Sequence, residues 1–181
     1  KELLKVIKGE LRDIKNTIGT ERKSVIEEEV SDLKVDETHL ITKEDVMVSV
    51  TKDGYIKRSS LKSYQASTKN GMKDGDAVVF CNMLNTLDTL LVFTSLGNYF
   101  YIPVYKITDV KWKDLGDHLS SICSLDKSKN ERVISVMCVA DFNESINVLC
   151  CTKEGLIKQL LLKDLEVSRY SKSIRYMKVA A

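Results

Sequence analysis

The residues best suited to chemistry form a basic cluster between positions 51 and 75. Its cationic members are Lys52, Lys57, Arg58, Lys62, Lys69 and Lys73, against Asp53 and Asp74 as anionic members. Ammonium and guanidinium groups bind phosphate oxygens, and a guanidinium can do so through two parallel hydrogen bonds. The net charge of the chain is only +2, but a local cluster of one sign can still attract a polyanion. The cluster therefore predicts a phosphate-binding surface.

We expect both charged and neutral side chains of this region to contact phosphate. The candidate contacts are Lys57, Arg58, Lys62, Gln65, Lys69, Asn70 and Lys73. Lys57 and Arg58 are neighbours on an expected strand, so their side chains should point to opposite faces. The alternative is a solvated strand edge whose charges only prevent aggregation. Weaker candidates further along the chain are Lys106, Lys111, Lys113, Lys158, Lys163, Arg169, Lys172 and Arg175.

No arrangement of residues predicts catalysis or metal binding by this chain. The two histidines, His39 and His118, lie in unrelated segments without acidic or nucleophilic partners nearby in the sequence. The five cysteines form no C-x-x-C pair, and this spacing argues against a zinc site. No apolar run is long enough to cross a membrane, so membrane insertion is not expected.

The basic cluster begins within the first copy of an internal β repeat. Each copy has an apolar run, a Thr-x-x-Gly turn and a second apolar run, with the turns at 51–54, 94–97 and 152–155. Glycine supplies the positive φ that a tight hairpin requires. The turns are separated by about one propeller blade. We therefore predict a mainly β fold with three propeller-like blades, at 46–88, 89–132 and 133–181, that form part of a larger assembly. Chance recurrence of hairpins in a β-sandwich is the alternative.

The first 30 residues are expected to be helical. Their apolar residues recur at alternating steps of three and four: Leu4, Ile7, Leu11, Ile14 and Ile18. Such a seam is typical of the end of a coiled coil or of a helix packed on a globular core. Gly19 is placed to end the helix, and Thr20 to cap a short second helix. An acidic linker is predicted at 31–45.

These segments together resemble the C-terminal β-pinwheel region of the A subunits of bacterial type IIA topoisomerases. The run 53–64 (DGYIKRSSLKSY) is similar to the first pinwheel blade, and 3–15 with 19–26 to the end of the coiled coil and its exit helix. The run 111–116 (KWKDLG) is similar to the Gram-positive topoisomerase IV form. Gyrase A subunits carry a Gln-Arg-Arg-Gly-Gly-Lys-Gly box where this chain has QASTKNGMK at 65–73. The departure favours topoisomerase IV over gyrase.

The resemblance implies that the chain binds and orients duplex DNA for ATP-dependent strand passage, decatenation and relaxation during chromosome segregation. It places the catalytic tyrosine before Lys1, so the fragment itself is not expected to be catalytic. The implied partners are duplex DNA, the B subunit, which would use ATP and Mg²⁺, and a second copy of the A subunit. The implied location is the cytoplasm, on the chromosome. A gyrase A C-terminal domain and a propeller that binds proteins remain the alternatives.

Overall fold

The computed structural model describes residues 2–20, 24, 40–123, 131–167, 170 and 172–179. The chain divides into two compact units, Lys1–Asp36 and Glu37–Ala181. In the first unit, helix α1 (Glu2–Ile18) has no buried residue, and the Gly19 N–H closes it on the Lys15 carbonyl at 2.9 Å. The predicted helix is thus present, and its pairing in a coiled coil stays a prediction. The expected second helix and most of the acidic linker, at 21–23 and 25–39, lie outside the described residues, as does Arg169.

The second unit consists mainly of strands, as predicted. The first sheet has the order β3-β1-β2-β6, and contains β1 (Asp45–Thr51), β2 (Tyr55–Ser60), β3 (Val78–Asn85) and β6 (Asp117–His118). The second has the order β10-β5-β4-β7, with β4 (Thr89–Thr94), β5 (Asn98–Pro103), β7 (Val133–Val139) and β10 (Ile174–Arg175). In the described residues the third sheet contains β8 (Asn147–Cys151) and β9 (Ile157–Leu161). No described helix is long and apolar enough to cross a membrane.

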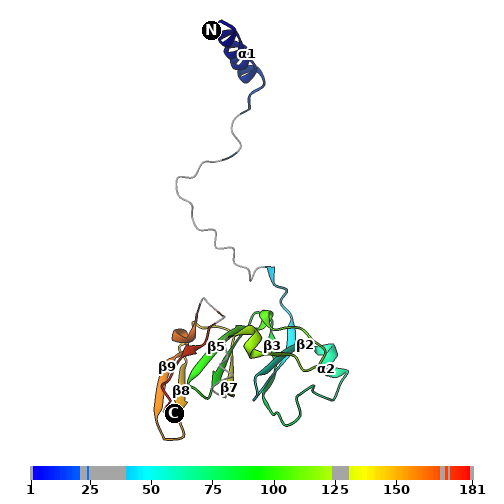
Figure 1. Cartoon of the computed structure of the whole chain (residues 1–181), viewed down its shortest axis with the longest axis vertical. Coiled ribbons are helices and arrows are strands. Elements are labelled where there is room, and N and C mark those ends of the chain that lie inside the picture. Colours follow the sequence, from blue (N-terminus) through cyan, green and yellow to red (C-terminus); the bar gives the residue numbers. More distant parts are fainter. Residues whose placement is uncertain are drawn as a thin grey trace. The chain divides into compact units, whose positions relative to one another are not determined.

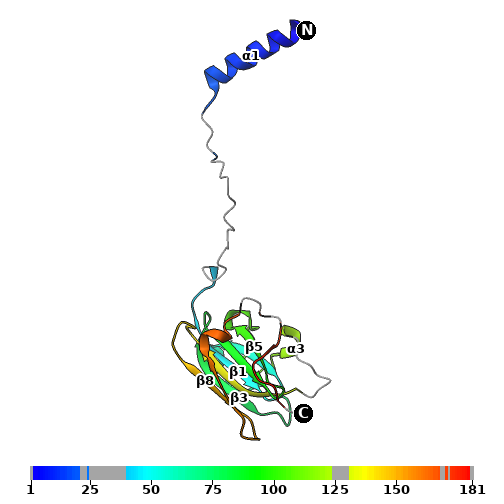
Figure 2. The same cartoon turned by 90° about the vertical axis from the view of Figure 1, so that its left-hand side faces the viewer.

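Short helices join the strands. They are α2 (Leu61–Gln65), α3 (Leu119–Ile122) and the 3-10 turns η2 (Val104–Lys106) and η4 (Leu162–Leu165). Figure 1 shows β2, β3 and α2 at one end of this unit and the β8–β9 hairpin at the other. Figure 2, turned by 90°, again places the hairpin of β8 on the outside of the unit.

The three predicted hairpin turns are confirmed. Gly54, Gly97 and Gly155 have φ values of 93°, 75° and 81°, and each glycine N–H bonds to the carbonyl of the threonine three residues earlier at 3.1 Å. The threonine hydroxyl also takes part in the turn. Its oxygen accepts from the N–H after the glycine, at 3.0 Å in the first turn and 3.2 Å in the third. Both residue types are therefore required by the turn itself.

Successive sheets exchange strands, which sequence patterning did not predict. After the β4–β5 hairpin the chain returns to pair β6 with β2, and after β8–β9 it returns to pair β10 with β5. The run 133–139 was expected to open the third blade, but β7 pairs with β4 along its whole length. The predicted boundary at 132–133 is therefore wrong. An apolar β-branched run is suited to either sheet, and only long-range pairing selects its partner.

The second sheet separates two hydrophobic cores. Every residue of β4 is buried. Leu90 and Val92 pack with Val48 of the first sheet, whereas Leu91 and Phe93 face the opposite way, towards the third sheet. The outer face of the first sheet is different, because its polar side chains Ser49, Lys57 and Ser59 bond to the segments 70–71 and 110–114, which cover it. This covered face positions the basic cluster.

Candidate nucleic-acid interface

The basic cluster lies on the segment that covers the outer face of the first sheet. Ser60 caps helix α2, because its hydroxyl accepts a hydrogen bond from the Ser63 N–H at 3.3 Å. Beyond the helix, the chain runs as a loop to β3. Among the predicted contacts, the exposed ones are Lys62, Gln65, Lys69 and Lys73. These side chains can reach a phosphate in solvent.

The ammonium of Lys73 has a weak competitor. It lies 4.0 Å from the Asp53 carboxylate, and the two side chains are 57% and 38% exposed. An exposed ion pair of this length contributes little free energy and is screened by salt. Lys73 can therefore leave Asp53 for a phosphate at small cost.

Lys57 is not available to phosphate, contrary to the prediction. It is only 2% exposed, and its Nζ donates to the carbonyls of Gly71 at 3.0 Å, Trp112 at 2.6 Å and Asp114 at 2.7 Å. The ammonium also lies 4.8 Å from the centre of the Trp112 ring. All three ammonium protons thus have acceptors inside the protein. The sequence could not show this, because two of the acceptors lie more than fifty positions away.

Burial changes the acid–base behaviour of Lys57. Removal of the ammonium from water lowers its pKa from 10.5 to about 8, and the opposing attraction of Asp114 and of Cys81 is smaller. Desolvation always favours the neutral form of a lysine. Even so, a pKa of about 8 leaves most of the population charged at neutral pH.

Arg58 points away from Lys57, as the strand geometry predicted. It is half-buried and lines a pocket of about 300 Å³ together with Glu44 and Asp109. Its Nε is buried and has no hydrogen-bond partner in the described part of the chain. The two carboxylates in its lining make this pocket a poor site for phosphate. Arg58 therefore does not join the surface formed by Lys62, Lys69 and Lys73.

Asn70 is also turned inward. Its amide nitrogen donates to the Ser49 hydroxyl of β1 at 3.4 Å, and its Oδ1 is buried. Asn70 thus attaches the loop to the sheet, and the prediction that it contacts phosphate does not agree with this position.

The structure brings two further lysines to the same place. The N–H of Gly71 donates to the Trp112 carbonyl at 3.1 Å, so the loop of Lys69 and Lys73 lies against the segment of Lys111 and Lys113, both exposed. Trp112 is 3% exposed, as is usual for a large aromatic side chain. The two lysines were weak candidates because they are about forty positions from the cluster. Their signal in the sequence was the Lys-Trp-Lys spacing around a large aromatic residue.

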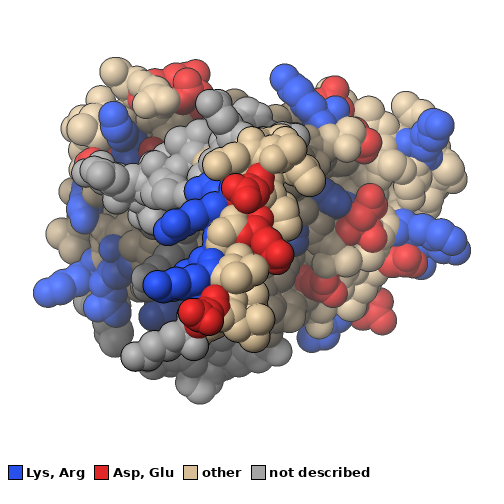
Figure 3. All heavy atoms as spheres, turned by 90° about the horizontal axis from the view of Figure 1, so that it is seen from above, with Lys and Arg blue, Asp and Glu red and all other residues tan. Residues whose placement is uncertain are grey.

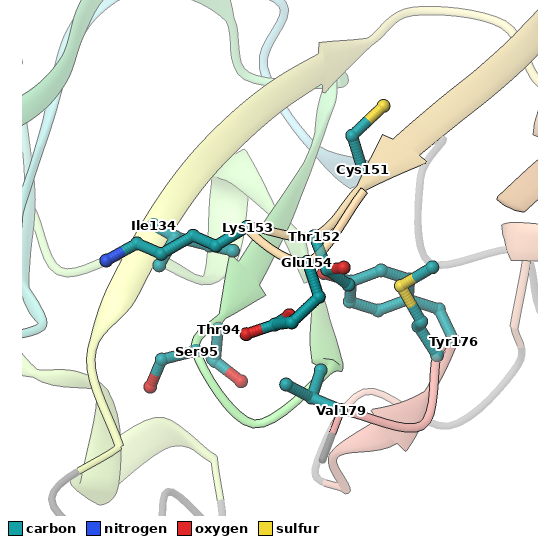
Figure 4. A pocket seen from close by; sticks show the side chains of 10 residues that line it. Thr94, Ser95, Ile134, Cys151, Thr152, Lys153, Glu154, Tyr176 and Val179 are labelled. Atoms are coloured by element: carbon teal, nitrogen blue, oxygen red, sulfur yellow. The ribbon is translucent and has the colours of Figure 1, made fainter. Parts of the chain in front are cut away.

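Charge elsewhere is mixed. Figure 3 shows lysines and arginines interspersed with aspartates and glutamates over the face in view. Another pocket, of about 350 Å³, lies between the second and third hairpin turns and is lined by Ser95, Glu154 and Tyr176 among others. Its charged lining residues are Lys153 and Glu154, and in Figure 4 Glu154 extends towards Thr94 and Ser95, so the pocket has no net positive charge to attract an anion. Among the described residues, no group of three histidine, cysteine or acidic side chains could hold a metal ion.

The repeats match a known family of β-propeller domains. The family model of the DNA gyrase C-terminal domain, beta-propeller, matches residues 45–85, 88–140 and 147–181. The chain belongs to this family. The matched ranges follow the observed strands, because β7 falls in the second range with β4 and β5.

Within the gyrase C-terminal domain family, the chain is similar to topoisomerase IV proteins. It is 41% identical over 179 residues to the A subunit of DNA topoisomerase 4 from Staphylococcus epidermidis, covering 98% of this chain and 22% of that protein. It is 39% identical over 176 residues to the Bacillus subtilis protein of the same name, covering 96% of this chain and 22% of that one. The chain thus spans about a fifth of the length of these relatives.

A solved structure of the family gives the same result. The crystal structure of the C-terminal domain of DNA topoisomerase IV superposes with a TM-score of 0.72 at 40% identity, covering 78% of this chain and 44% of that one. The resemblance to topoisomerase IV seen in the sequence is therefore confirmed, and so is the mainly β, propeller-like fold.

Proposed function

We propose that this chain is a C-terminal DNA-binding region of the topoisomerase IV A subunit, which holds duplex DNA on one basic surface. The basic surface is defined as Lys62, Lys69, Lys73, Lys111 and Lys113. The observation that carries the proposal is the close approach of two lysine-bearing segments at Gly71 and Trp112. Gln65, exposed on α2, adds a neutral contact.

The binding depends on the phosphate backbone. Each lysine that meets a phosphate releases condensed counterions, so affinity falls as salt rises and depends little on base sequence. Five lysines on one fixed surface suit a duplex, whose phosphates are regularly spaced. In contrast, a protein-binding propeller would more often present an apolar patch at this place.

In the whole enzyme this region would position a DNA duplex for ATP-dependent strand passage, decatenation and relaxation. Two copies of the A subunit would act with the B subunit, which would supply ATP hydrolysis and Mg²⁺. The catalytic tyrosine would lie outside this chain. The enzyme would work in the cytoplasm on the chromosome. A gyrase role is disfavoured, because the segment 65–73 lacks the paired arginines of the gyrase box.

The test is a titration of the chain with a short fluorescent duplex at several salt concentrations. The variant carries Lys62→Glu, Lys69→Glu and Lys73→Glu. The matched control carries Lys5→Glu, Lys8→Glu and Lys15→Glu on α1, which changes the net charge equally on the other unit. We expect the variant to lose most binding and the slope of log affinity against log salt to shrink by about 0.9 for each phosphate that is no longer bound. Equal binding by the variant and the control would contradict the proposed surface.

A further inference from the structure

The buried ammonium of Lys57 joins three separate parts of the chain. It comes from β2 and donates to Gly71 in the loop after α2 and to Trp112 and Asp114 in the segment before β6. A single nitrogen with three protons meets three carbonyl oxygens, so every donor is used. Neither a thioether nor a hydroxyl can replace three hydrogen bonds that radiate from one point.

The two segments held by Lys57 are in backbone contact. At Gly71 a Cβ atom would lie 2.1 Å from the Lys113 carbonyl oxygen and 2.5 Å from that of Asp114. Trp112 also holds this junction in place. Its N–H donates to the Ser63 hydroxyl at 2.9 Å, and its ring packs edge-to-face on that of Tyr64 with 4.8 Å between the ring centroids. The junction therefore has little freedom to shift while Lys57 is in place.

The lysines of the basic surface sit directly on this junction. Lys69 and Lys73 are each two residues from Gly71, and Lys111 and Lys113 flank Trp112. Their backbone positions are set by the same carbonyls that Lys57 binds. A change at Lys57 would therefore reach the basic surface without removing any of its charges.

The fold itself does not require a lysine at this position. In the second repeat the corresponding residue, three after the turn glycine, is Phe100, which is fully buried. An apolar side chain is thus accommodated by the same strand position, and it avoids the cost of burying a charge. In the third repeat the corresponding residue is Lys158, which is exposed and whose Nζ donates to the Tyr176 carbonyl at 2.5 Å. What distinguishes Lys57 is its burial and its three carbonyl acceptors, which core packing does not require.

We infer that Lys57 is a positioning residue for DNA binding: its ammonium holds the segments 69–73 and 111–113 together as one basic surface, and it does not touch the DNA. The inference rests on the proposed DNA-binding function. It differs from a direct phosphate contact in one measurable respect, namely that positive charge alone at position 57 is not sufficient.

The experiment compares duplex binding by the chain with binding by Lys57→Met and Lys57→Arg. Arginine keeps the charge but cannot place one nitrogen among three carbonyls, so we expect both variants to lose about tenfold in affinity through lost pre-organisation. The control is Lys153→Arg on the third hairpin turn, which keeps an exposed charge outside the basic surface and should bind as the unchanged chain does. Wild-type affinity in Lys57→Arg or in Lys57→Met would overturn the inference.

Amide hydrogen exchange separates local loosening from global unfolding. In Lys57→Met the Gly71 amide should exchange faster, while the Gly54 amide, which donates to the Thr51 carbonyl in the β1–β2 turn, keeps its protection. Charge reversal of Lys113 should also cost less affinity in Lys57→Met than in the unchanged chain, because the two positions are coupled. Unchanged exchange at Gly71, or full additivity with Lys113→Glu, would overturn the inference.

If the Lys57 variants unfold, another variant tests whether the junction positions the basic surface. Ser63→Ala removes the acceptor of the Trp112 N–H without opening the core, and should lower affinity about two- to threefold. Wild-type affinity in Ser63→Ala would then overturn the inference. A different failure would overturn the proposed function instead: no binding of duplex by the unchanged, folded chain. In that case Gly71 exchange still reports whether Lys57 holds the junction.

Discussion

Lys57 and Arg58 show how little a residue type says about its environment. Both are cationic neighbours on β2, yet one is nearly inaccessible and bonded to three carbonyls, and the other faces a pocket with two carboxylates. The alternation of a strand was enough to predict that they face apart. It was not enough to predict what covers each face.

Because Lys57 is buried, its contribution to the free energy of unfolding should increase with pH in the alkaline range. Its pKa is about 8 when folded against an ordinary 10.5, so between these values the unfolded chain binds more protons. The contribution of Lys57 to the free energy of unfolding therefore rises as the pH increases from about 8 towards 10.5, by up to ~1.4 kcal/mol per pH unit. In urea unfolding, the free energy of unfolding of the chain minus that of Lys57→Met should therefore be larger at pH 9 than at pH 7.5.

The comparison with Lys57→Met is needed because buried thiols act in the opposite direction. Burial raises the pKa of Cys123 and of Cys138 from 9.0 to about 11. Their contribution to stability is therefore lost as the pH rises above about 9. Both proteins share these thiols, so the difference cancels them and reports Lys57 together with Cys81, the thiol that interacts with it. A difference that stays constant between pH 7.5 and 9 would contradict the assignment.

At the scale of elements, β4 supports both cores. Leu90 and Leu91 are both 0% exposed although they point to opposite faces, because sheets pack on either side. We expect Leu90→Ala and Leu91→Ala each to lower the free energy of unfolding by about 2–5 kcal/mol. Chemical denaturation measures these changes in the free energy of unfolding. The control is Met83→Ala on the edge strand β3, where the side chain is 57% exposed and the change should be near zero. A large effect at only one of the two leucines would contradict a sheet buried on both faces.

At the scale of the whole molecule, the third sheet is less covered than the other two. In the described residues β8 and β9 pair only with each other, and Leu149, Ile157 and Leu161 are 65%, 69% and 50% exposed. Open strand edges with apolar side chains favour association between chains. We expect the isolated chain to self-associate as its concentration rises.

Sedimentation velocity at several concentrations tests this expectation. Ile157→Lys should reduce self-association, whereas Gln159→Lys, on the same strand and exposed, adds the same charge without removing apolar surface. Both variants leave the seam of α1 unchanged. A chain that stays monomeric at all concentrations, or two variants that behave alike, would exclude the third sheet as the contact.

The sequence by itself determined the local features of this protein. The Thr-x-x-Gly turns were readable because the backbone bonds that define them join residues three apart and require a positive φ at glycine. The helix at Glu2–Ile18 and the strand character of the apolar runs follow from periodicity over a few residues. The family resemblance rested on these same contiguous segments.

Only the tertiary structure decided which basic residues share a surface and which strands share a sheet. Lys57 is buried because Trp112 and Asp114 return to cover it, and Lys111 joins Lys69 through the same return. The strand β7 pairs with β4, and not with the hairpin that follows it. Each of these outcomes depends on contacts between positions about forty to sixty residues apart. Such contacts leave no periodic signal in the sequence, because hydrogen-bond partners are chosen by the packing of the whole chain.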